Sequence, residues 1–393
     1  FIQNTSTKVA FVSTNSITQG EQVGILWSYL LSKGIKIHFA HRTFQWSNEA
    51  RGIAAVHCVI VGFGLETPKN YRLFEYEDIK KDGVEISAQN INPYLTNASN
   101  VLIEKRSKPI SNVSIMTRGS QPTDGGNLLL NQDEKDALTA KEPQAVEWIK
   151  TFSMGEEFIN NIPRYCLWLK DCPPDKLRKM PLTLQKVEQV KQMRLASTKS
   201  STRDWASRPT LFTEDRQPKN SYLAIPRVSS ERRNFIPIGF LNSEHIAGDK
   251  LQIIPNATLY DFGILNSTMH NSWMRTVAGR LKSDYSYSVG IVYNNFAWPT
   301  PTDKQKATIE KAAQAVLDAR LLYPQSSLAD LYDPRTMPPE LVKAHQQLDK
   351  AVDAAYGKTF KNEAERVAHL FELYQQLTAP LVQAQKVKKR KGA

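Results

Sequence analysis

The spacing of three apolar segments near the start of the chain constrains its fold more than any other sequence feature. Val9–Val12 predicts a short buried strand, and residues 21–33 carry apolar side chains at helical spacing. Two further strands are predicted at Ile35–Phe39 and Ile53–Phe63. The segment between them is too short for a crossover helix, so these strands are expected to pair antiparallel. This is an unusual ending for a parallel, doubly wound α/β sheet.

The rest of the chain divides by pattern into three further parts. Residues 65–150 are mixed, with strands predicted at Tyr71–Tyr76 and Val101–Glu104. The next part alternates short strands with helices, including a charged helix over residues 176–197. Three amphipathic helices follow, which predict a small bundle packed on the rest. They cover residues 303–320, 339–356 and 362–378. The predicted division is 1–64, 65–150, 151–300 and 301–393, the last ending in a basic tail.

The balance of charges favours a polyanionic partner. The formal net charge is +12, and between Lys186 and Arg233 eleven Lys/Arg accompany only five Asp/Glu. Trp205, Phe212 and Tyr222 are interleaved with these basic residues. A nucleic acid would suit this pattern, although a solvated basic face has the same composition.

The cysteine content and hydropathy exclude other classes of protein. Cys58, Cys166 and Cys172 are sparse and lack a histidine cluster, so they predict a reducing cytoplasm and no metal site. No run of 18 apolar residues occurs, so no membrane helix or membrane partner is expected.

Several long motifs identify a family. The order of strands in residues 9–63 resembles the last three strands of class I S-adenosylmethionine-dependent methyltransferases. Nearly the whole chain is similar to the MmeI-like family, single-chain type II restriction–modification enzymes with an N6-adenine DNA methyltransferase domain. The segments that carry this resemblance are Val9–Gln22, Ile37–Ala50, Tyr222–Arg233, Gly279–Ser288, Val292–Pro299, Leu328–Pro334 and Glu365–Phe371.

The resemblance implies a three-part α/β architecture. It consists of the C-terminal part of a class I methyltransferase sheet, a mixed α/β target-recognition domain and a helical C-terminal domain that braces it. The family's S-adenosylmethionine loop and its Asn-Pro-Pro-Tyr/Phe motif occur nowhere in these 393 residues. We therefore expect no catalytic or cofactor-binding residue in this chain. An upstream methyltransferase half, in the same or a separate chain, is expected to supply both, and the chain alone is expected not to methylate.

The resemblance also implies base flipping, because the adenine amine is buried in the duplex. Related enzymes stack the flipped base on an aromatic ring just before the final hairpin, and Phe44 and Trp46 are expected in that loop. The alternative for at least one of them is a cap on the end of the sheet. Ser13, Thr14 and Asn15 end the first strand and are candidate pocket residues, with an ordinary strand-ending turn as the alternative.

Base reading in this family maps to the variable positions of a Gly-Arg-Leu-x-Ser-x-Tyr motif. Here these positions are Lys282 and Asp284, a donor and an acceptor suited to a G·C pair, and they predict guanine on the methylated strand. By a looser alignment, Asp249 and Lys250 are a second reading position. A surface charge pair without function is the alternative for Lys282 and Asp284.

Seven residues are candidate phosphate contacts, which would position the duplex without reading its sequence. A structural ion pair is the alternative for two of them, Arg227 and Arg280. The seven are Arg227, Ser229, Ser230, Arg232, Arg233, Arg275 and Arg280.

The function predicted from the sequence is specific recognition of double-stranded DNA within an adenine-N6 methyltransferase. A non-catalytic specificity subunit that pairs with a separate methyltransferase chain is the first alternative, and the methyltransferase-like strands of residues 9–63 argue against it. A nuclease acting alone and a general basic nucleic-acid-binding module are the others. Isolated acidic residues such as Asp124 do not support a nuclease site.

Overall fold

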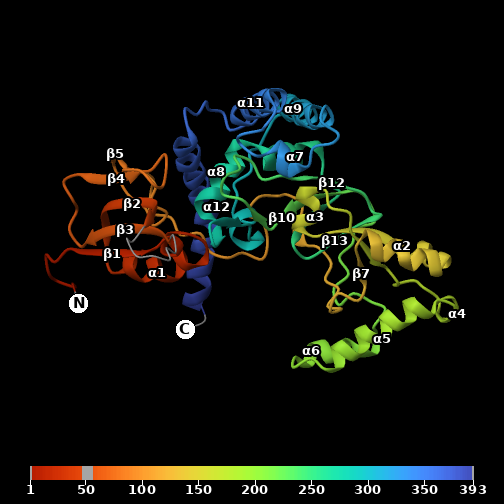
Figure 1. Cartoon of the computed structure of the whole chain (residues 1–393). Coiled ribbons are helices and arrows are strands. Elements are labelled where there is room, and N and C mark those ends of the chain that lie inside the picture. The colour runs from red at the N-terminus through yellow and green to blue at the C-terminus, as the bar shows by residue number, and fades with distance from the viewer. Residues whose placement is uncertain (1, 47–55, 392–393) are drawn as a thin grey trace.

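The computed structural model describes residues 2–46 and 56–391, which form three regions along the chain (Figure 1). A sheet near the N-terminus lies on one side and a mixed α/β region on the other. The C-terminal helices lie over and between them. This arrangement agrees with the mixed α/β class, with a helical C-terminal part, that the sequence predicts.

The first region is a five-stranded sheet with the strand order β1-β3-β2-β4-β5. Strand β3 is antiparallel to both β1 and β2, so β1 and β2 run parallel on either side of it. The predicted antiparallel hairpin is thereby confirmed, while residues 53–55 of the predicted strand lie outside the described residues. The strands are β1 (Val9–Thr14), β2 (Lys36–Trp46), β3 (Val56–Gly64), β4 (Tyr71–Glu75) and β5 (Val84–Ala88).

Helix α1 (Glu21–Ser32) packs on this sheet through its apolar face. Val23 and Trp27 are fully buried, and the Trp27 ring lies 6.3 Å from that of Phe63 on β3. Burying one such side chain stabilises the fold by about 2–3 kcal/mol. Gly34, with φ of +82°, permits the left-handed turn that leads from α1 into β2.

Of the two strands predicted within residues 65–105, the structure confirms one and contradicts the other. The predicted strand at Tyr71 is confirmed as β4, which pairs parallel to β2. The predicted strand Val101–Glu104 is wrong, because the segment pairs with no strand among the described residues. Val101 and Ile103 are nevertheless buried, so this apolar run reflects burial in the core rather than sheet pairing.

The middle region contains three small sheets. Their strand orders are β12-β10-β14-β6, β13-β8-β9-β7 and β11-β16-β15. The strands are β6 (Thr117–Arg118), β7 (Leu129–Leu130), β8 (Ile149–Ser153), β9 (Tyr165–Leu167), β10 (Tyr222–Pro226), β11 (Val228–Ser229), β12 (Gly239–Leu241), β13 (His245–Ala247), β14 (Leu251–Pro255), β15 (Gly279–Leu281) and β16 (Asp284–Ser286).

Helices flank these sheets. The predicted helix over residues 176–197 is two helices, α4 and α5, because Pro181 starts a new helix where it has no N–H to continue the old one. The helices are α2 (Gln132–Lys141), α3 (Gly155–Asn160), α4 (Pro174–Arg178), α5 (Pro181–Leu195), α6 (Ser200–Arg203), α7 (Leu259–Asn266) and α8 (Thr268–Val277).

The C-terminal region consists of α9 (Asp303–Leu321), α10 (Leu328–Leu331), α11 (Pro339–Ala355) and α12 (Glu363–Lys391). Helices α9 and α11 pack on each other and on α7. Helix α12 leaves this pair and runs along α8, where Phe371 packs 5.5 Å from Trp273 (Figure 1). The last helix therefore lies between the first sheet and the middle region.

Candidate nucleic-acid interface

The predicted pocket residues and aromatic rings lie at one edge of the first sheet. In the strand register, Thr14 on β1 and Phe44 on β2 are both opposite Cys58 on β3, so the three lie in a row. Asn15 donates a hydrogen bond from its amide to the Thr43 hydroxyl at 3.4 Å. This edge contains the carboxyl ends of β1 and β2, where open α/β sheets bind their ligands.

Part of this edge is an ordinary strand-ending turn, as the alternative reading of Ser13–Asn15 proposed. Asn15 is buried and begins a short 3-10 helix, and Thr14 shares a 2.8 Å hydrogen bond with Ser16. Thr14 remains exposed, whereas Ser13 is partly covered. Of the three, Thr14 is therefore the side chain that a ligand reaches most directly.

Phe44 and Trp46 belong to strand β2 itself, not to a loop after it, which corrects the predicted position. Both point to the same face, because they are two residues apart in a strand. The ring of Phe44 stacks on that of Tyr76, with centroids 5.4 Å apart and planes at 22°. Trp46 is 47% exposed. One face of Phe44 is thus covered, while Trp46 presents an open ring.

His41 holds the ring of Tyr76, on which Phe44 stacks. His41 Nδ1 and the Tyr76 hydroxyl are 2.7 Å apart, and the imidazole stacks on Phe74 at 4.1 Å. Burial lowers the pKa of His41, and the nearby Arg72 lowers it further. His41 therefore stays neutral near pH 7 and acts as a structural support.

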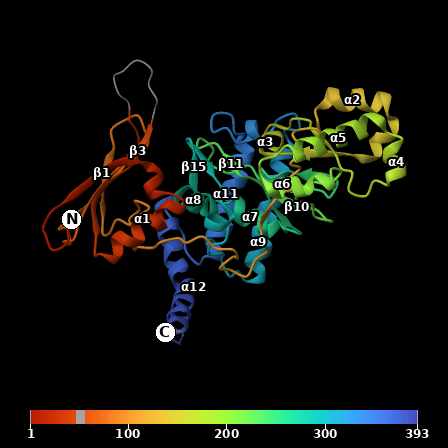
Figure 2. The same cartoon turned by 90° about the horizontal axis from the view of Figure 1, so that it is seen from below.

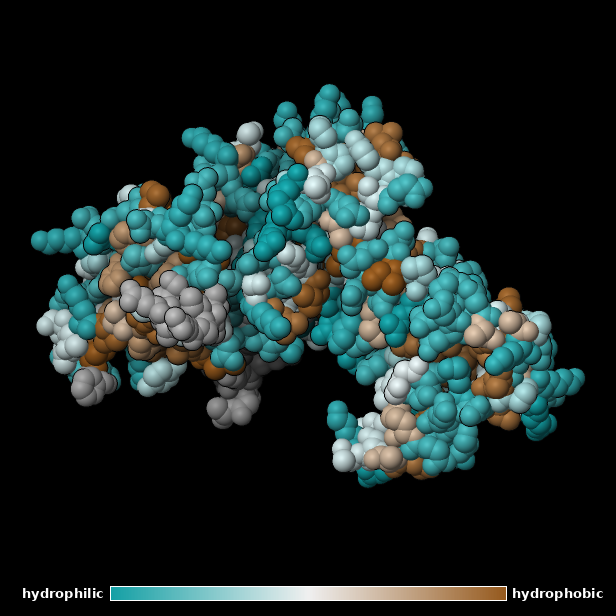
Figure 3. All heavy atoms as spheres, viewed as in Figure 1, coloured by the Kyte–Doolittle hydropathy of each residue, from teal (hydrophilic) through white to brown (hydrophobic). Residues whose placement is uncertain are grey.

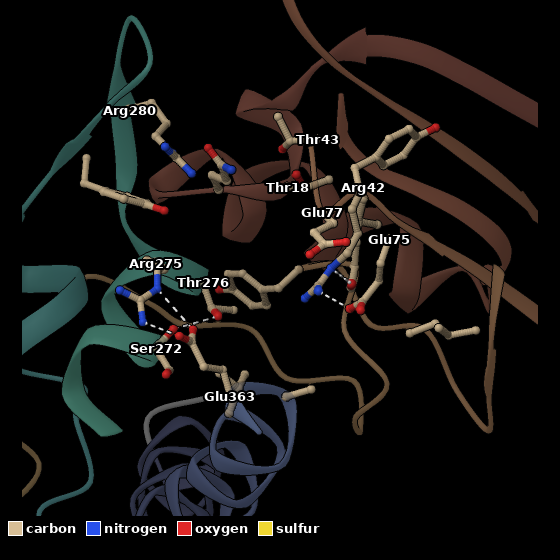
Figure 4. A pocket seen from close by; sticks show the side chains of 18 of the residues that line it. Thr18, Arg42, Thr43, Glu75, Glu77, Ser272, Arg275, Thr276, Arg280 and Glu363 are labelled. Atoms are coloured by element: carbon tan, nitrogen blue, oxygen red, sulfur yellow. Dashed lines mark hydrogen bonds and ion pairs between the residues drawn. The ribbon is translucent and has the colours of Figure 1, made fainter. Parts of the chain in front are cut away.

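A cleft with a volume of about 660 Å³ separates this edge from the middle region (Figure 4). Arg42, Thr43 and Tyr76 line one side. The other side is lined by α8 and β15, and α12 closes the floor with Glu363. In the view of Figure 2, β3 and β15 lie toward the same side of the molecule and α12 toward the other.

The two predicted base-reading residues lie on a hairpin beside this cleft. Strands β15 and β16 are joined by the two-residue turn Lys282–Ser283, and Leu281 is opposite Asp284. Lys282 is exposed, and Asp284 is partly exposed. No ion pair joins Lys282 to Asp284 within the described residues, so the proposed surface charge pair does not form here. Both side chains are accessible to a partner.

The second pair of predicted reading residues is in a turn linked to that hairpin. Asp249 and Lys250 connect β13 to β14, and their charged groups are 3.9 Å apart. Arg227 donates its backbone N–H to the Lys250 carbonyl at 3.0 Å and its guanidinium to the Asp249 carbonyl at 3.1 Å. The next residue, Val228, pairs with Ser286 of the hairpin. One segment therefore fixes both turns relative to each other.

The predicted phosphate contacts separate into accessible and occupied residues. Arg232 is exposed, and Ser230 is partly exposed. Arg233 is half-buried, and burial lowers the pKa of its guanidinium. Ser229 is only 4% exposed, so its hydroxyl is not accessible to a phosphate, and the prediction for this residue is corrected.

The remaining arginines have partners within the chain. Arg275 pairs with Glu363 at 2.7 Å and donates to the Asn234 carbonyl at 2.7 Å. Arg280 pairs with Glu231 at 3.5 Å, which is the structural ion pair given as its alternative. Their partners lie 88 and 49 residues away in the sequence, so no local pattern indicated these contacts. Arg227 makes backbone contacts, as described above.

The C-terminal helices brace the loop that contains Arg232 and Arg233. Phe235 stacks on His345 of α11 at 3.9 Å. His345 Nε2 lies 2.9 Å from the Tyr332 hydroxyl, which also accepts from Arg320 of α9. Arg320 in turn donates to the Ile238 carbonyl at 2.7 Å. These contacts tie residues 235–238 to the C-terminal domain.

Two classes of site are not found in the described part of the chain. No group of three or more His, Cys, Asp or Glu residues in 2–46 and 56–391 is placed to hold a metal ion. None of the helices in the described ranges has both the length and the apolar character needed to cross a membrane.

Comparison with known proteins assigns a family to all three regions. Residues 1–75 match the MmeI DNA-methyltransferase domain, residues 97–300 the MmeI target recognition domain and residues 301–382 the MmeI C-terminal domain. Residues 97–116, between β5 and β6, fall within the match to the target recognition domain.

Two relatives extend along nearly the whole chain. DNA methyltransferase A of Bacillus subtilis (strain 168) is 42% identical over 380 residues, which cover 96% of this chain and 42% of that protein. A solved structure of the type IIL restriction–modification enzyme MmeI in complex with DNA is 51% identical, with a TM-score of 0.89, covering 96% of this chain and 50% of that chain. The chain thus spans about half the length of these relatives or somewhat less, and it belongs to the MmeI family of DNA methyltransferases with a target recognition domain.

Proposed function

We propose that this chain recognises a specific sequence in double-stranded DNA and presents the target adenine to an upstream methyltransferase half. The observation that carries the proposal is the position of Lys282 on an exposed hairpin turn beside the cleft. The opposite side of the cleft is lined by Arg42 and Thr43 of β2, the strand that also contains Phe44 and Trp46. A duplex read by the hairpin would place a neighbouring base pair at the sheet edge. The bound DNA named for the solved relative supports this reading.

The chemistry of the exposed residues is suited to this task. A Lys ammonium donates to guanine O6 and N7, and a carboxylate accepts from cytosine N4. Lys282 and Asp284 together would read one G·C pair, and Asp249 with Lys250 a second. Arg232 and Ser230 would contact phosphates and set the register without specifying bases. Arg275 and Arg280 are less available for this, because carboxylates offset their charge.

At the sheet edge, an aromatic ring would hold the flipped adenine. Stacking of a base on an aromatic side chain contributes about 1–3 kcal/mol. Trp46 has the open ring for this contact, and Phe44, backed by Tyr76, would form the wall beside it. Thr14 would line the pocket from β1. The chain's own contribution is therefore binding and orientation of the base.

Methyl transfer itself would need groups from elsewhere. S-adenosylmethionine, the methyl donor of such enzymes, does not fit the described residues: β1 ends in a 3-10 helix rather than a glycine-rich turn, and the family's cofactor loop is not in this sequence. We propose that an upstream half supplies the cofactor site and the catalytic motif. Such an enzyme would act in the cytoplasm, where bacterial DNA is found.

The surface proposed for that upstream half is the outer side of strand β1, a different part of the first sheet from the end that contains Phe44 and Trp46. Strand β1 is an edge strand within the described ranges, yet Phe11 and Val12 on it are 37% and 60% exposed. Ile25 and Tyr29 of α1 add exposed apolar surface, and Figure 3 shows hydrophobic residues on this side of the molecule. An exposed apolar edge strand is a template for pairing with a further strand.

Selection from a library of randomised duplexes tests the proposed function. The wild-type chain is expected to enrich one short sequence that contains a G·C pair contacted by Lys282. Lys282→Ala should then lose discrimination at that pair by about 1–3 kcal/mol, with other positions unchanged. Enrichment of no sequence would leave a general nucleic-acid-binding module, and an equal loss of affinity on every duplex would show that Lys282 contacts phosphate only.

A further inference from the structure

We propose that Arg280 is a positioning residue that, with Glu231 and Tyr285, holds the turn presenting Lys282 and Asp284. Base discrimination would then depend on three side chains that touch no base. This inference rests on the proposed function, because it concerns the same recognition hairpin. It assigns Arg280 a different role from the phosphate contact that the sequence predicts.

The turn has a backbone conformation that needs support. Lys282 has φ of +57°, in the left-handed region that side chains other than glycine rarely adopt. In this region the Cβ atom lies close to the following carbonyl oxygen, so the conformation is strained unless the surrounding contacts hold it. Only two residues, Lys282 and Ser283, connect β15 to β16. The side chain that must point at a base edge is therefore mounted on the strained position of the turn.

Arg280 contacts this turn directly. Its Nη1 donates to the backbone carbonyl of Ser283, the second turn residue, at 2.7 Å. The same nitrogen lies 3.5 Å from the Glu231 carboxylate, and the guanidinium carbon is 3.8 Å from the centre of the Tyr285 ring. Arg280 and Tyr285 are also directly opposite each other in the hairpin register. The guanidinium is thus fixed from the side and from one face.

Glu231 extends this support to the second reading residue. Its backbone N–H donates to the Asp284 carboxylate at 3.4 Å, while its side chain pairs with Arg280. Glu231 belongs to the loop that the C-terminal helices brace through Phe235. The orientations of Lys282 and Asp284 therefore depend on one connected set of contacts.

The surroundings of Arg280 argue against a phosphate contact. Its side chain is only 14% exposed, although it faces the cleft in Figure 4. A carboxylate offsets its charge, and an aromatic ring covers one face. Arg232, on the same loop as Glu231, is exposed and is the matched control, because it is the arginine proposed to contact phosphate. Preorganised recognition side chains need this kind of fixed support.

The test compares four variants on the sequence selected by the wild-type chain and on a duplex changed at the base pair read by Lys282. Arg280→Lys keeps the charge but loses the planar fork and the stacking on Tyr285, and Glu231→Gln keeps the shape but loses the ion pair. Each is expected to reduce discrimination about tenfold or more, with an unchanged salt dependence. Tyr285→Phe, which keeps the stacked ring, should keep wild-type discrimination. Arg232→Ala should weaken binding equally on both duplexes and reduce the salt slope by about 1.

Other outcomes overturn the inference. If Glu231→Gln tightens binding equally on both duplexes, the released Arg280 contacts phosphate. If Arg280→Lys and Glu231→Gln both keep wild-type discrimination, the turn does not need them. If the wild-type chain selects no sequence at all, the proposed function itself is wrong. This outcome is distinct from variants that keep wild-type discrimination, which contradict only the role of Arg280. Urea unfolding of Glu231→Gln checks that the variant remains folded.

Discussion

The carboxylate of Asp349 on α11 accepts two hydrogen bonds from Thr268, one from the backbone N–H and one from the hydroxyl, each at 2.6 Å. Thr268 is the first residue of α8, the helix that lines the cleft with Ser272, Arg275 and Thr276. A carboxylate at a helix N-terminus satisfies its free N–H groups. This contact joins α11 to the cleft wall, in addition to the packing of α12 along α8.

This contact predicts a pH dependence of stability. Burial raises the pKa of Asp349 to about 6, although the Thr268 hydrogen bonds and Arg366 act in the opposite direction. Since the pKa is raised above the ordinary value of 3.8 for an aspartate, the folded state holds the extra proton between these two pKa values. The stabilising contribution is full below about pH 4 and is lost as the pH rises through 6. The free energy of unfolding of the wild type relative to Asp349→Asn should fall by about 3 kcal/mol at most from pH 4 to 7.

Urea unfolding at several pH values measures this difference. The Asn side chain still accepts a hydrogen bond from Thr268 but carries no proton that titrates. The nearby Asp353–Arg366 ion pair is common to both proteins, so its own pH dependence cancels in the comparison. A difference that rises with pH would mean that the hydrogen bonds and Arg366, not burial, control the ionisation of Asp349.

The second prediction concerns a fully buried arginine. Arg194, at the end of α5, donates five hydrogen bonds, all to backbone carbonyls. Its acceptors are Pro122, Thr123, Trp205, Arg208 and Leu211. Arg194→Met fills the space but leaves these carbonyls without a donor. Because each unsatisfied buried group costs about 1–3 kcal/mol, we expect a loss of about 4 kcal/mol or more.

Local measurements separate this effect from general destabilisation. Hydrogen exchange should accelerate first in residues 205–211, which Arg194 joins to the loop at Pro122. Arg203→Ala is the control, because Arg203 is an exposed residue of α6, the helix that follows α5. This substitution should change the free energy of unfolding by less than about 0.5 kcal/mol. Protection of 205–211 equal to that of the wild type in Arg194→Met would contradict the assigned role.

Local pattern and long-range contact explain what the sequence predicted and what it missed. The hairpin of β2 and β3 was predictable because its two apolar segments are close in the sequence. Strand β5 was not predicted, although Val84 to Ala88 alternate between apolar and polar residues behind an Asp-Gly pair, a pattern typical of a strand. The motif drew attention to Lys282 and Asp284, which lie at and beside the β15–β16 turn, and their role in reading bases stays a prediction. The partners of Arg275 and Arg280 come from distant segments and needed the folded structure.

The third prediction divides the roles of the two aromatic residues in β2. Phe44 packs on Tyr76 and His41, so Phe44→Ala should destabilise the fold by about 2 kcal/mol or more. Trp46 is about half exposed, so Trp46→Ala should cost less than about 1 kcal/mol of stability. On a selected duplex whose target adenine is mispaired, Trp46→Ala should lose about 1–3 kcal/mol of binding.

Two measurements check this division. Urea unfolding gives the stability of each variant, and titration of matched and mispaired duplexes gives the stacking contribution. Trp46→Phe is the control, because it keeps an aromatic face and should retain most of the preference for the mispaired duplex. If Trp46→Ala binds both duplexes as the wild type does, the base does not stack on Trp46.

The fourth prediction concerns the exposed outer side of strand β1 and the neighbouring face of α1. Val12→Lys on β1 places a charge where an added strand would pair, and Ile25→Lys does the same on the exposed face of α1. If an upstream methyltransferase half docks there, both substitutions should block methylation when the two halves are produced separately and mixed. Sequence-specific binding by this chain alone should be unchanged, because neither residue lines the cleft.

A charge elsewhere on the surface provides the control. Leu322, after α9, is 63% exposed and lies in the C-terminal region, so Leu322→Lys should leave both DNA binding and reconstituted methylation at the wild-type level. Charged residues on an edge strand oppose pairing with a new strand, which gives Val12→Lys the stronger expected effect of the two. Full methylation by mixtures that contain Val12→Lys would show that the upstream half is held at another surface.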